Sequence, residues 1–420
     1  MEDQSSVKLQ TANAQELYNY FQVYGNTLYF KQQILILDFR PSDQFELCHL
    51  VSSINIPLEK CLDSDFTSFK ESRFLTKFCH SEKQKERFKK RKRLLVFMVV
   101  CNKNCDQLLE INSSLLAAKN KGRKSLGKKN DLKALKNAIM MQSILVKDRH
   151  RDCYLLKSGM NVFQDKYPFL CAFEGRKAHT VADCGRYPSE IFEAFLYLSN
   201  CKVAKDADLL QTLGITHILN VSDNVPNYFE ENYLGLKYSN IEIDDVEDAP
   251  IEDYFEKAYN IINKVLTGED EKSEDSDKCC YKEEHYSDEF DTQTLKLDLT
   301  SKTIDLWENC EIKRTISSID LSIEDAHKKN PNSRILVHCA MGRSRSPTIV
   351  IMYIMKRFEL PFEIAFKLVL QRREKIDINP GFIEKLKQFE ADGFKFSTES
   401  AFDSSDSTEA GEVTPNASLA

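Results

Sequence analysis

The stretch RILVHCAMGRSRSPTIVIMYIM, residues 334–355, decides the fold of its part of the chain. An apolar run ends at His338 and predicts a buried strand, a short loop contains Gly342, and the apolar pattern from Arg345 onward predicts a helix. A strand, a tight loop and a helix in this order are typical of α/β folds. Such a loop turns backbone N–H groups into one concavity at a helix N-terminus, so we expect an anion site for phosphate here.

Five residues of this stretch have side chains or backbone suited to phosphate chemistry. The field at a helix N-terminus stabilises a thiolate, so we expect Cys339 to ionise below the ~8.5 of a free cysteine and to act as a nucleophile. Arg345, six positions later, supplies a planar fork for two phosphoryl oxygens. Gly342 would let the loop turn, Ser346 would donate a hydrogen bond to the departing sulfur, and His338 would orient the loop from behind.

Apolar runs separated by helical patterns predict an α/β fold class with two α/β domains, each with a largely parallel sheet. In the first domain, residues 11–172, we expect strands at 34–38, 94–100 and 153–156 and a helix at 131–145. In the second domain, residues 183–396, we expect strands at 195–198, 215–221, 238–243 and 334–338, and helices at 345–357, 361–372 and 381–390.

The net charge of −7 is concentrated in one segment. Residues 269–291 contain 11 acidic and 3 basic side chains. Low hydrophobicity and like charge predict disorder there, so we expect an acidic insert at about 267–315 to interrupt the second domain. The Ser/Thr-rich and acidic tail, residues 397–420, is expected to be disordered as well.

Composition excludes several classes of protein. At 42% hydrophobic residues with 26 Phe, the chain of 420 residues can form packed cores. No apolar run approaches the ~18 residues that span a membrane, and the N-terminus MEDQSSVKLQ lacks a secretory signal pattern. Thirteen cysteines indicate free thiols in a reducing compartment. We expect a cytoplasmic protein, with nuclear or mitochondria-associated positions left open, that binds no nucleic acid.

The motif HCAMGRSRS, residues 338–346, resembles the active-site signature of the dual-specificity protein phosphatases. The segments beginning at Tyr187, Leu209 and Ile378 are similar to family segments in family order. The resemblance implies a phosphocysteine intermediate, no cofactor and no metal ion, and phosphotyrosine and phosphoserine or phosphothreonine substrates. It also implies that the phosphate-binding loop consists of Ala340, Met341, Gly342, Arg343 and Ser344.

This family uses an aspartic acid to protonate the leaving oxygen. Counting back from the aromatic pair Tyr254–Phe255 places the family match at Asp245, with Asp244 and then Asp248 as the alternatives. Asn379 matches the family asparagine that braces the phosphate loop. Ile378 stands before it, where the family usually has proline.

The first domain resembles the rhodanese-type domain in front of MAP-kinase phosphatases. Rhodaneses carry a catalytic cysteine in an Arg-closed loop after the central strand, whereas the loop after Cys101 reads CNKNCDQLL, with neither Gly nor Arg. We therefore expect a non-catalytic domain and exclude a sulfurtransferase. The run Lys83–Arg93 has 8 basic and 1 acidic residues. It is interpreted either as a solvated loop or as the docking site for a phosphoprotein partner, a MAP kinase being the candidate.

Two functions remain open at this point. The first is an active cysteine phosphatase acting on a phosphoprotein. The second is a phosphoprotein-binding pseudophosphatase, a scaffold or regulator that keeps the loop without turnover. The two-domain arrangement is similar to the serine/threonine/tyrosine-interacting-like proteins, whose vertebrate forms lack the nucleophile. Because this chain retains Cys339, the inactive label does not follow from that similarity.

Overall fold

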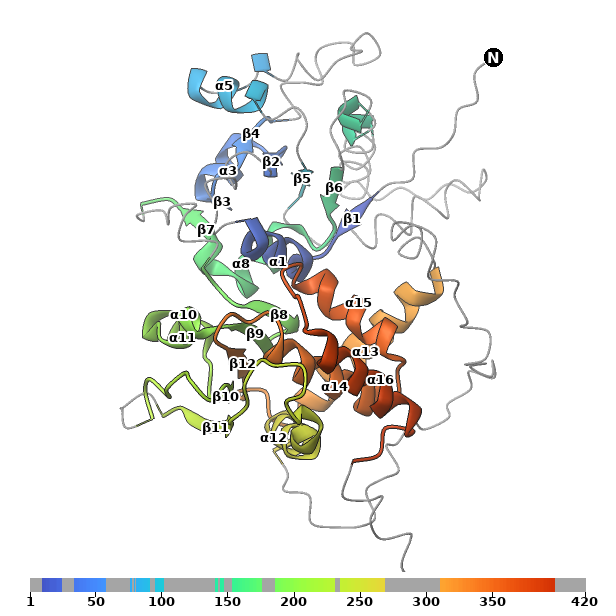
Figure 1. Ribbon diagram of the computed structural model, residues 1–420. Helices are drawn as coiled ribbons and strands as arrows, with labels where there is room; N and C mark the ends of the chain where they lie inside the picture. Colours follow the sequence, from blue (N-terminus) through green and yellow to red (C-terminus); the bar gives the residue numbers. More distant parts are fainter. Residues whose placement is uncertain are drawn as a thin grey trace, which may run out of the picture. The chain divides into compact units, whose positions relative to one another are not determined.

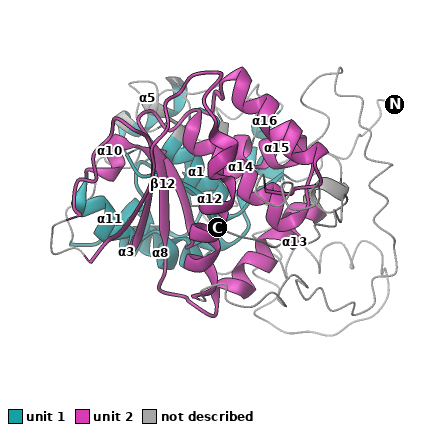
Figure 2. Cartoon of the chain, turned by 60° about the horizontal axis from the view of Figure 1, so that its bottom comes forward, with its two compact units in different colours: residues 1–193, 206–213, 372–375 teal, residues 194–205, 214–371, 376–420 magenta. Residues whose placement is uncertain are grey.

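The chain divides into two units, which Figure 2 colours separately. The first contains residues 1–193, 206–213 and 372–375, and the second contains 194–205, 214–371 and 376–420. The computed structural model describes residues 10–24, 34–57, 76–77, 79, 81–90, 95–101, 140–142, 144–146, 153–175, 186–230, 235–268 and 310–396. Nearly all of the expected acidic insert, the tail 397–420, the end of the basic run at 91–93 and most of the helix expected at 131–145 lie outside the described residues.

The first unit contains a parallel sheet with the strand order β1-β6-β5-β2-β4. Its strands are β1 (Thr11–Ala12), β2 (Ile34–Asp38), β4 (Ile54–Asn55), β5 (Leu95–Val99) and β6 (Cys153–Leu156). All five residues of β2 are buried, as expected for a parallel strand that is covered on both faces. The three strands predicted in this region are confirmed, and β5, which precedes Cys101, is the central strand.

The remaining elements of the first unit are short. A two-stranded antiparallel sheet pairs β3 (Cys48–Leu50) with β7 (Cys171–Phe173). The other elements are α1 (Ala14–Tyr24), α3 (Ser42–Leu47), α5 (Glu82–Lys90), α8 (Gly159–Lys166), η3 (Pro168–Leu170), β8 (Ser189–Phe192) and α11 (Ala207–Leu213).

Helix α5 contains most of the basic run Lys83–Arg93. The expectation of a solvated loop is therefore wrong for residues 83–90. Phe88 is fully buried in a hydrophobic cluster with residues such as Leu35 and Val96 of the sheet. One buried apolar side chain of this kind places one face of a short polar helix against the core, and charged side chains then occupy the opposite face.

Four parallel strands of the second unit run side by side in the order β11-β10-β12-β9 (Figure 1). They are β9 (Leu196–Asn200), β10 (His217–Val221), β11 (Lys237–Ile241) and β12 (Ile335–Cys339), and each predicted strand is confirmed within two or three residues. All five residues of β12 are buried, as expected for a parallel strand that is covered on both faces. The strand is also paired at both edges, and His338 lies opposite Asn220 of β10 and Ser199 of β9.

Helix α14 follows β12 directly and forms part of the core. Its residues 345–355 are all buried, which fits a helix that is apolar on every side. The helices predicted after β12 are confirmed as α14 (Arg345–Phe358), α15 (Phe362–Arg372) and α16 (Pro380–Ala391). The others are α10 (Cys201–Ala204), η4 (Ile251–Tyr254), α12 (Phe255–Thr267) and α13 (Cys310–His327). None of the helices in the described part of the chain has the length and apolarity that a bilayer crossing requires.

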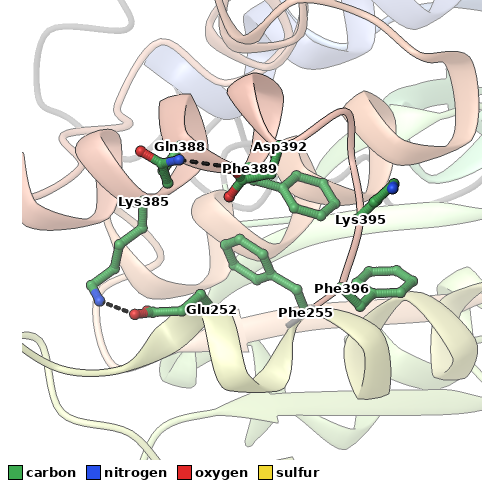
Figure 3. A pocket seen from close by; sticks show the side chains of 8 residues that line it. All are labelled: Glu252, Phe255, Lys385, Gln388, Phe389, Asp392, Lys395 and Phe396. Atoms are coloured by element: carbon green, nitrogen blue, oxygen red, sulfur yellow. Dashed lines mark hydrogen bonds and ion pairs between the residues drawn. The ribbon is translucent and has the colours of Figure 1, made fainter. Parts of the chain in front are cut away.

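Helix α16 is fastened to η4 and α12 at a small pocket with an aromatic lining (Figure 3). The rings of Phe255 and Phe389 meet edge to face with centroids 5.3 Å apart. Lys385 forms an ion pair with Glu252 beside them. These contacts fix α16 as a whole, and Asn379 caps its N-terminus.

Gly381, in the first turn of α16, touches the segment 244–248. A Cβ atom at this position would lie 2.0 Å from the carbonyl oxygen of Glu247, whereas real Cβ contacts under 3.0 Å essentially do not occur. Only glycine therefore permits this approach of helix to loop.

Replacing Gly381 by Ala should displace the segment 244–248 or α16. We expect the free energy of unfolding to fall by about 1–3 kcal/mol, the usual cost of an overpacked contact, as measured by urea denaturation of the full chain. Glu384→Ala, an exposed change on the same helix, should alter it by less than about 0.5 kcal/mol. Equal stability of Gly381→Ala and the wild type would contradict the close approach.

Candidate active site

The loop between β12 and α14 folds back over the sulfur of Cys339. This side chain is 1% exposed. Its Sγ accepts hydrogen bonds from the backbone N–H of Gly342 at 3.2 Å and from Oγ of Ser346 at 3.3 Å. Gly342 has a φ of 65°, in the left-handed region that glycine adopts freely. The loop therefore has the turn that the sequence predicts, and two donors are directed at the sulfur.

The guanidinium of Arg345 is held by the ends of two neighbouring strands. Its side chain is 6% exposed. Its Nη1 donates to Oγ of Ser222 at 3.0 Å, to Oδ1 of Asp223 at 3.2 Å and to the carbonyl oxygen of Ile243 at 2.9 Å. Ser222 and Asp223 follow β10, and Ile243 follows β11. A buried cation requires such partners, and together they fix the direction of the fork.

One donor of Arg345 is left over. Among the described residues, its buried Nε has no hydrogen-bond partner. Oδ2 of Asp245 lies 3.8 Å from it, within ion-pair range but beyond a hydrogen bond. A buried N–H without a partner is costly unless a ligand satisfies it. The geometry therefore leaves a donor for an anion close to the loop of Cys339.

Asp245 is the carboxylate that the structure brings to the phosphate loop. Its Oδ1 accepts hydrogen bonds from Oγ of Ser344 at 2.6 Å and from Nδ2 of Asn379 at 2.9 Å. Asp244, the first alternative, accepts a hydrogen bond from the backbone N–H of Asp245. It thereby shapes the turn that carries Asp245.

Asn379 ties the start of α16 to this arrangement. Its side-chain oxygen accepts from the backbone N–H of Phe382 at 2.9 Å and caps the helix. Its own backbone N–H donates to Oγ of Ser344 at 3.2 Å. Asn379 therefore contacts both the loop and Asp245, which fits the bracing role that the resemblance implies.

The remaining predicted site residues differ in exposure. His338 is 1% exposed, and burial lowers its pKa to about 4, so it is neutral at pH 7. The carbonyl oxygen of Ala340 accepts from the backbone N–H of Cys201 at 3.3 Å. Met341 is 66% exposed. The guanidinium of Arg343 pairs with Asp377 at 2.7 Å on the surface, which leaves its backbone N–H for the expected contact with phosphate.

Sequence reasoning missed Ser222 and Asp223 as partners of Arg345. The available signal is their place directly after the strand HILNV, because carboxyl ends of parallel strands meet at one edge of a sheet. Using that signal requires knowing that β10 lies beside β12. A metal site has no support in the described part of the chain, which holds no group of three or more His, Cys, Asp or Glu suited to an ion.

Comparison with known proteins points to one family. The family model described as "Dual specificity phosphatase, catalytic domain" matches residues 196–273 and 281–392. A probable rhodanese domain-containing dual specificity protein phosphatase of Dictyostelium discoideum is 24% identical over 402 residues, which cover 90% of this chain and 68% of the relative. Dual specificity protein phosphatase 1-A of Xenopus laevis is 27% identical over 281 residues, covering 61% of this chain.

The chain spans 58% of the length of the Xenopus relative. Among solved structures, the human tyrosine phosphatase-like serine/threonine/tyrosine-interacting protein is similar at 22% identity with a TM-score of 0.31, covering 50% of this chain and 99% of that one. The family match contains β12, the loop of Cys339 and Arg345, and the segment of Asp245. The second half of this chain is therefore similar to the catalytic domain of the dual-specificity phosphatases.

Proposed function

We propose that this protein is a cysteine-dependent phosphatase that hydrolyses phosphotyrosine and phosphoserine or phosphothreonine in a protein substrate. The observation that supports this most is the meeting of three groups at one loop. The sulfur of Cys339 accepts two hydrogen bonds, the fork of Arg345 retains an unsatisfied N–H, and the carboxylate of Asp245 is bonded to Ser344. These are a nucleophile, an oxyanion binder and an acid.

The reaction proceeds in two steps in this proposal. The thiolate of Cys339 attacks phosphorus, the S–P bond forms, the P–O bond to the substrate breaks, and Asp245 gives its proton to the leaving oxygen. Water then attacks the phosphocysteine while Asp245 takes up a proton, and inorganic phosphate leaves. Arg345 and the loop N–H groups stabilise the equatorial oxygens throughout. Ser346 donates to the sulfur when it departs as a thiolate.

The variant Cys339→Ser tests whether this protein is an enzyme or a pseudophosphatase. The wild-type chain should release phosphate from an aryl phosphate, and the variant should release none above background, because the hydroxyl is a far weaker nucleophile. The variant should still bind a phosphopeptide, since the backbone of the loop is unchanged. If the wild type shows no more turnover than Cys339→Ser, the protein is a phosphoprotein-binding scaffold.

The variant Asp245→Ala tests the role of Asp245 as the acid, because the loss of rate should depend on how much the leaving group needs a proton. Phosphoprotein hydrolysis should slow by about 10²–10⁴, the usual worth of general acid catalysis. The loss should shrink for an aryl phosphate with an acidic phenol, because that oxygen needs no proton in order to leave. Asp248→Asn, the last of the three candidates, should keep the wild-type rate with both substrates. If Asp248→Asn instead slowed phosphoprotein hydrolysis and Asp245→Ala did not, Asp248 would be the acid.

We further propose that the first unit is a non-catalytic rhodanese-like domain that docks a phosphoprotein partner, with a MAP kinase as the candidate. Helix α5 supports this, because buried Phe88 fixes a helix that is rich in basic side chains on the first unit. Positively charged surfaces favour association with acidic partners and raise the on-rate. Among the described residues, Cys101 follows the central strand β5 and is partly exposed.

Reversing Arg91, Lys92 and Arg93 to Glu should weaken kinase binding at least tenfold, about 1.4 kcal/mol, without changing aryl phosphate turnover. Binding is measured by calorimetry with a purified MAP kinase. A control reversal at Lys328 and Lys329, which directly follow α13, should leave binding as in the wild type. Equal affinity of all three proteins for the kinase would remove the docking role of this run.

A further inference from the structure

Two exposed apolar side chains stand on the segments that frame the loop of Cys339. Met341 is 66% exposed and lies two residues after Cys339. Val246 is 45% exposed and directly follows Asp245, whose carboxylate is bonded to Ser344 of the loop. Among the described residues only a few large hydrophobic side chains are this exposed. Exposed apolar groups beside a site indicate contact with a partner.

The same surroundings are strongly acidic. The segment 244–248 reads Asp-Asp-Val-Glu-Asp, and all five residues are exposed. Asp223, which binds Arg345, has a side chain that is 43% exposed. On the described part of the second unit, the guanidinium of Arg345 is buried and that of Arg343 is already paired with Asp377. The exposed segment next to the phosphate loop therefore contains four acidic residues, at positions 244, 245, 247 and 248.

The acidic segment is held in a fixed position. Nδ2 of Asn379 lies 3.5 Å from the carbonyl oxygen of Val246, and the backbone of Glu247 rests against Gly381. Asp245 is bonded to Ser344 at the same time. Because the loop is fastened at three consecutive residues, its charges keep one place relative to the bound phosphate.

We infer that this site prefers a phosphorylated residue that is flanked in its protein chain by Lys or Arg and by an apolar side chain. The inference rests on the proposed phosphatase function and names its substrate class. A phosphorylated residue brings negative charge close to the acidic segment 244–248, and a neighbouring cation in the substrate offsets the resulting repulsion. Substrates that carry several phosphates or carboxylates are rejected by the same charges. Met341 and Val246 provide the contact for the apolar neighbour.

The test uses the full chain and two phosphotyrosine peptides of equal length and equal apolar content. One has two Lys beside the phosphotyrosine, and the other has two Glu. We expect kcat/KM to be higher for the basic peptide by about tenfold, from two exposed ion pairs of modest strength. The preference should shrink when ionic strength rises, because exposed charges are screened.

Removing a negative charge from the segment 244–248 should remove part of this preference for the basic peptide. The variant Glu247→Gln should lower the ratio of kcat/KM for the two peptides by about twofold, while aryl phosphate turnover stays at the wild-type rate. The matched control is Glu324→Gln, an exposed acid on α13, which precedes the N-terminal end of β12. This control should keep the full preference.

The two proposals fail in different ways. If aryl phosphate is hydrolysed but both peptides react equally, the charge preference is refuted and the phosphatase stands. If aryl phosphate is not hydrolysed, binding of both peptides to Cys339→Ser by fluorescence anisotropy still tests the preference, and equal affinities refute it. Faster hydrolysis of a short-chain phosphoinositide than of the basic peptide would overturn the substrate class.

Discussion

The buried guanidinium of Arg345 is the charge on which the candidate active site depends. A cation that is withdrawn from water is stable only if oxygens replace its hydration. Here they come from Ser222, Asp223 and the carbonyl of Ile243, at the carboxyl ends of β10 and β11. The order β11-β10-β12 brings these ends beside the loop that follows β12. The carboxyl edge of the sheet thus supplies the partners of Arg345, and the motif supplies Arg345 and the loop of Cys339.

The acid and the nucleophile share one support. Ser344 lies in the loop of Cys339, accepts from the backbone of Asn379 and donates to Asp245. The spacing between sulfur and carboxylate is therefore set by side chains that contact one another, although 93 residues separate the two in the sequence. Preorganisation of this kind lowers the reorganisation that a phosphoryl transfer step requires.

The residues 334–355 were predictable as strand, loop and helix because their pattern is local. Apolar content defined β12, and the motif located the sulfur and its donors. The partners of Arg345 were not predictable in the same way, since Ser222 becomes a neighbour only through strand order. Helix α5 was not predictable, because the run 83–93 has eight basic residues and only one apolar residue, Phe88. The burial of Phe88 depends on tertiary contacts that the local sequence does not indicate. Asp245 was identified by spacing, whereas its bond to Ser344 required the fold.

The way in which α12 ends has a consequence for the evolution of this domain. Gly268 closes the helix with a φ of 76°, and Nδ2 of Asn330 donates to the carbonyl oxygen of Val265 at 3.0 Å. The end of α12 is thus tied to the turn before β12. The entropy of closing a loop grows only with the logarithm of its length. Segments between Gly268 and α13 can therefore lengthen or change composition at little thermodynamic cost, which makes this junction a place where new regulatory sequence can be acquired without disturbing the catalytic strand.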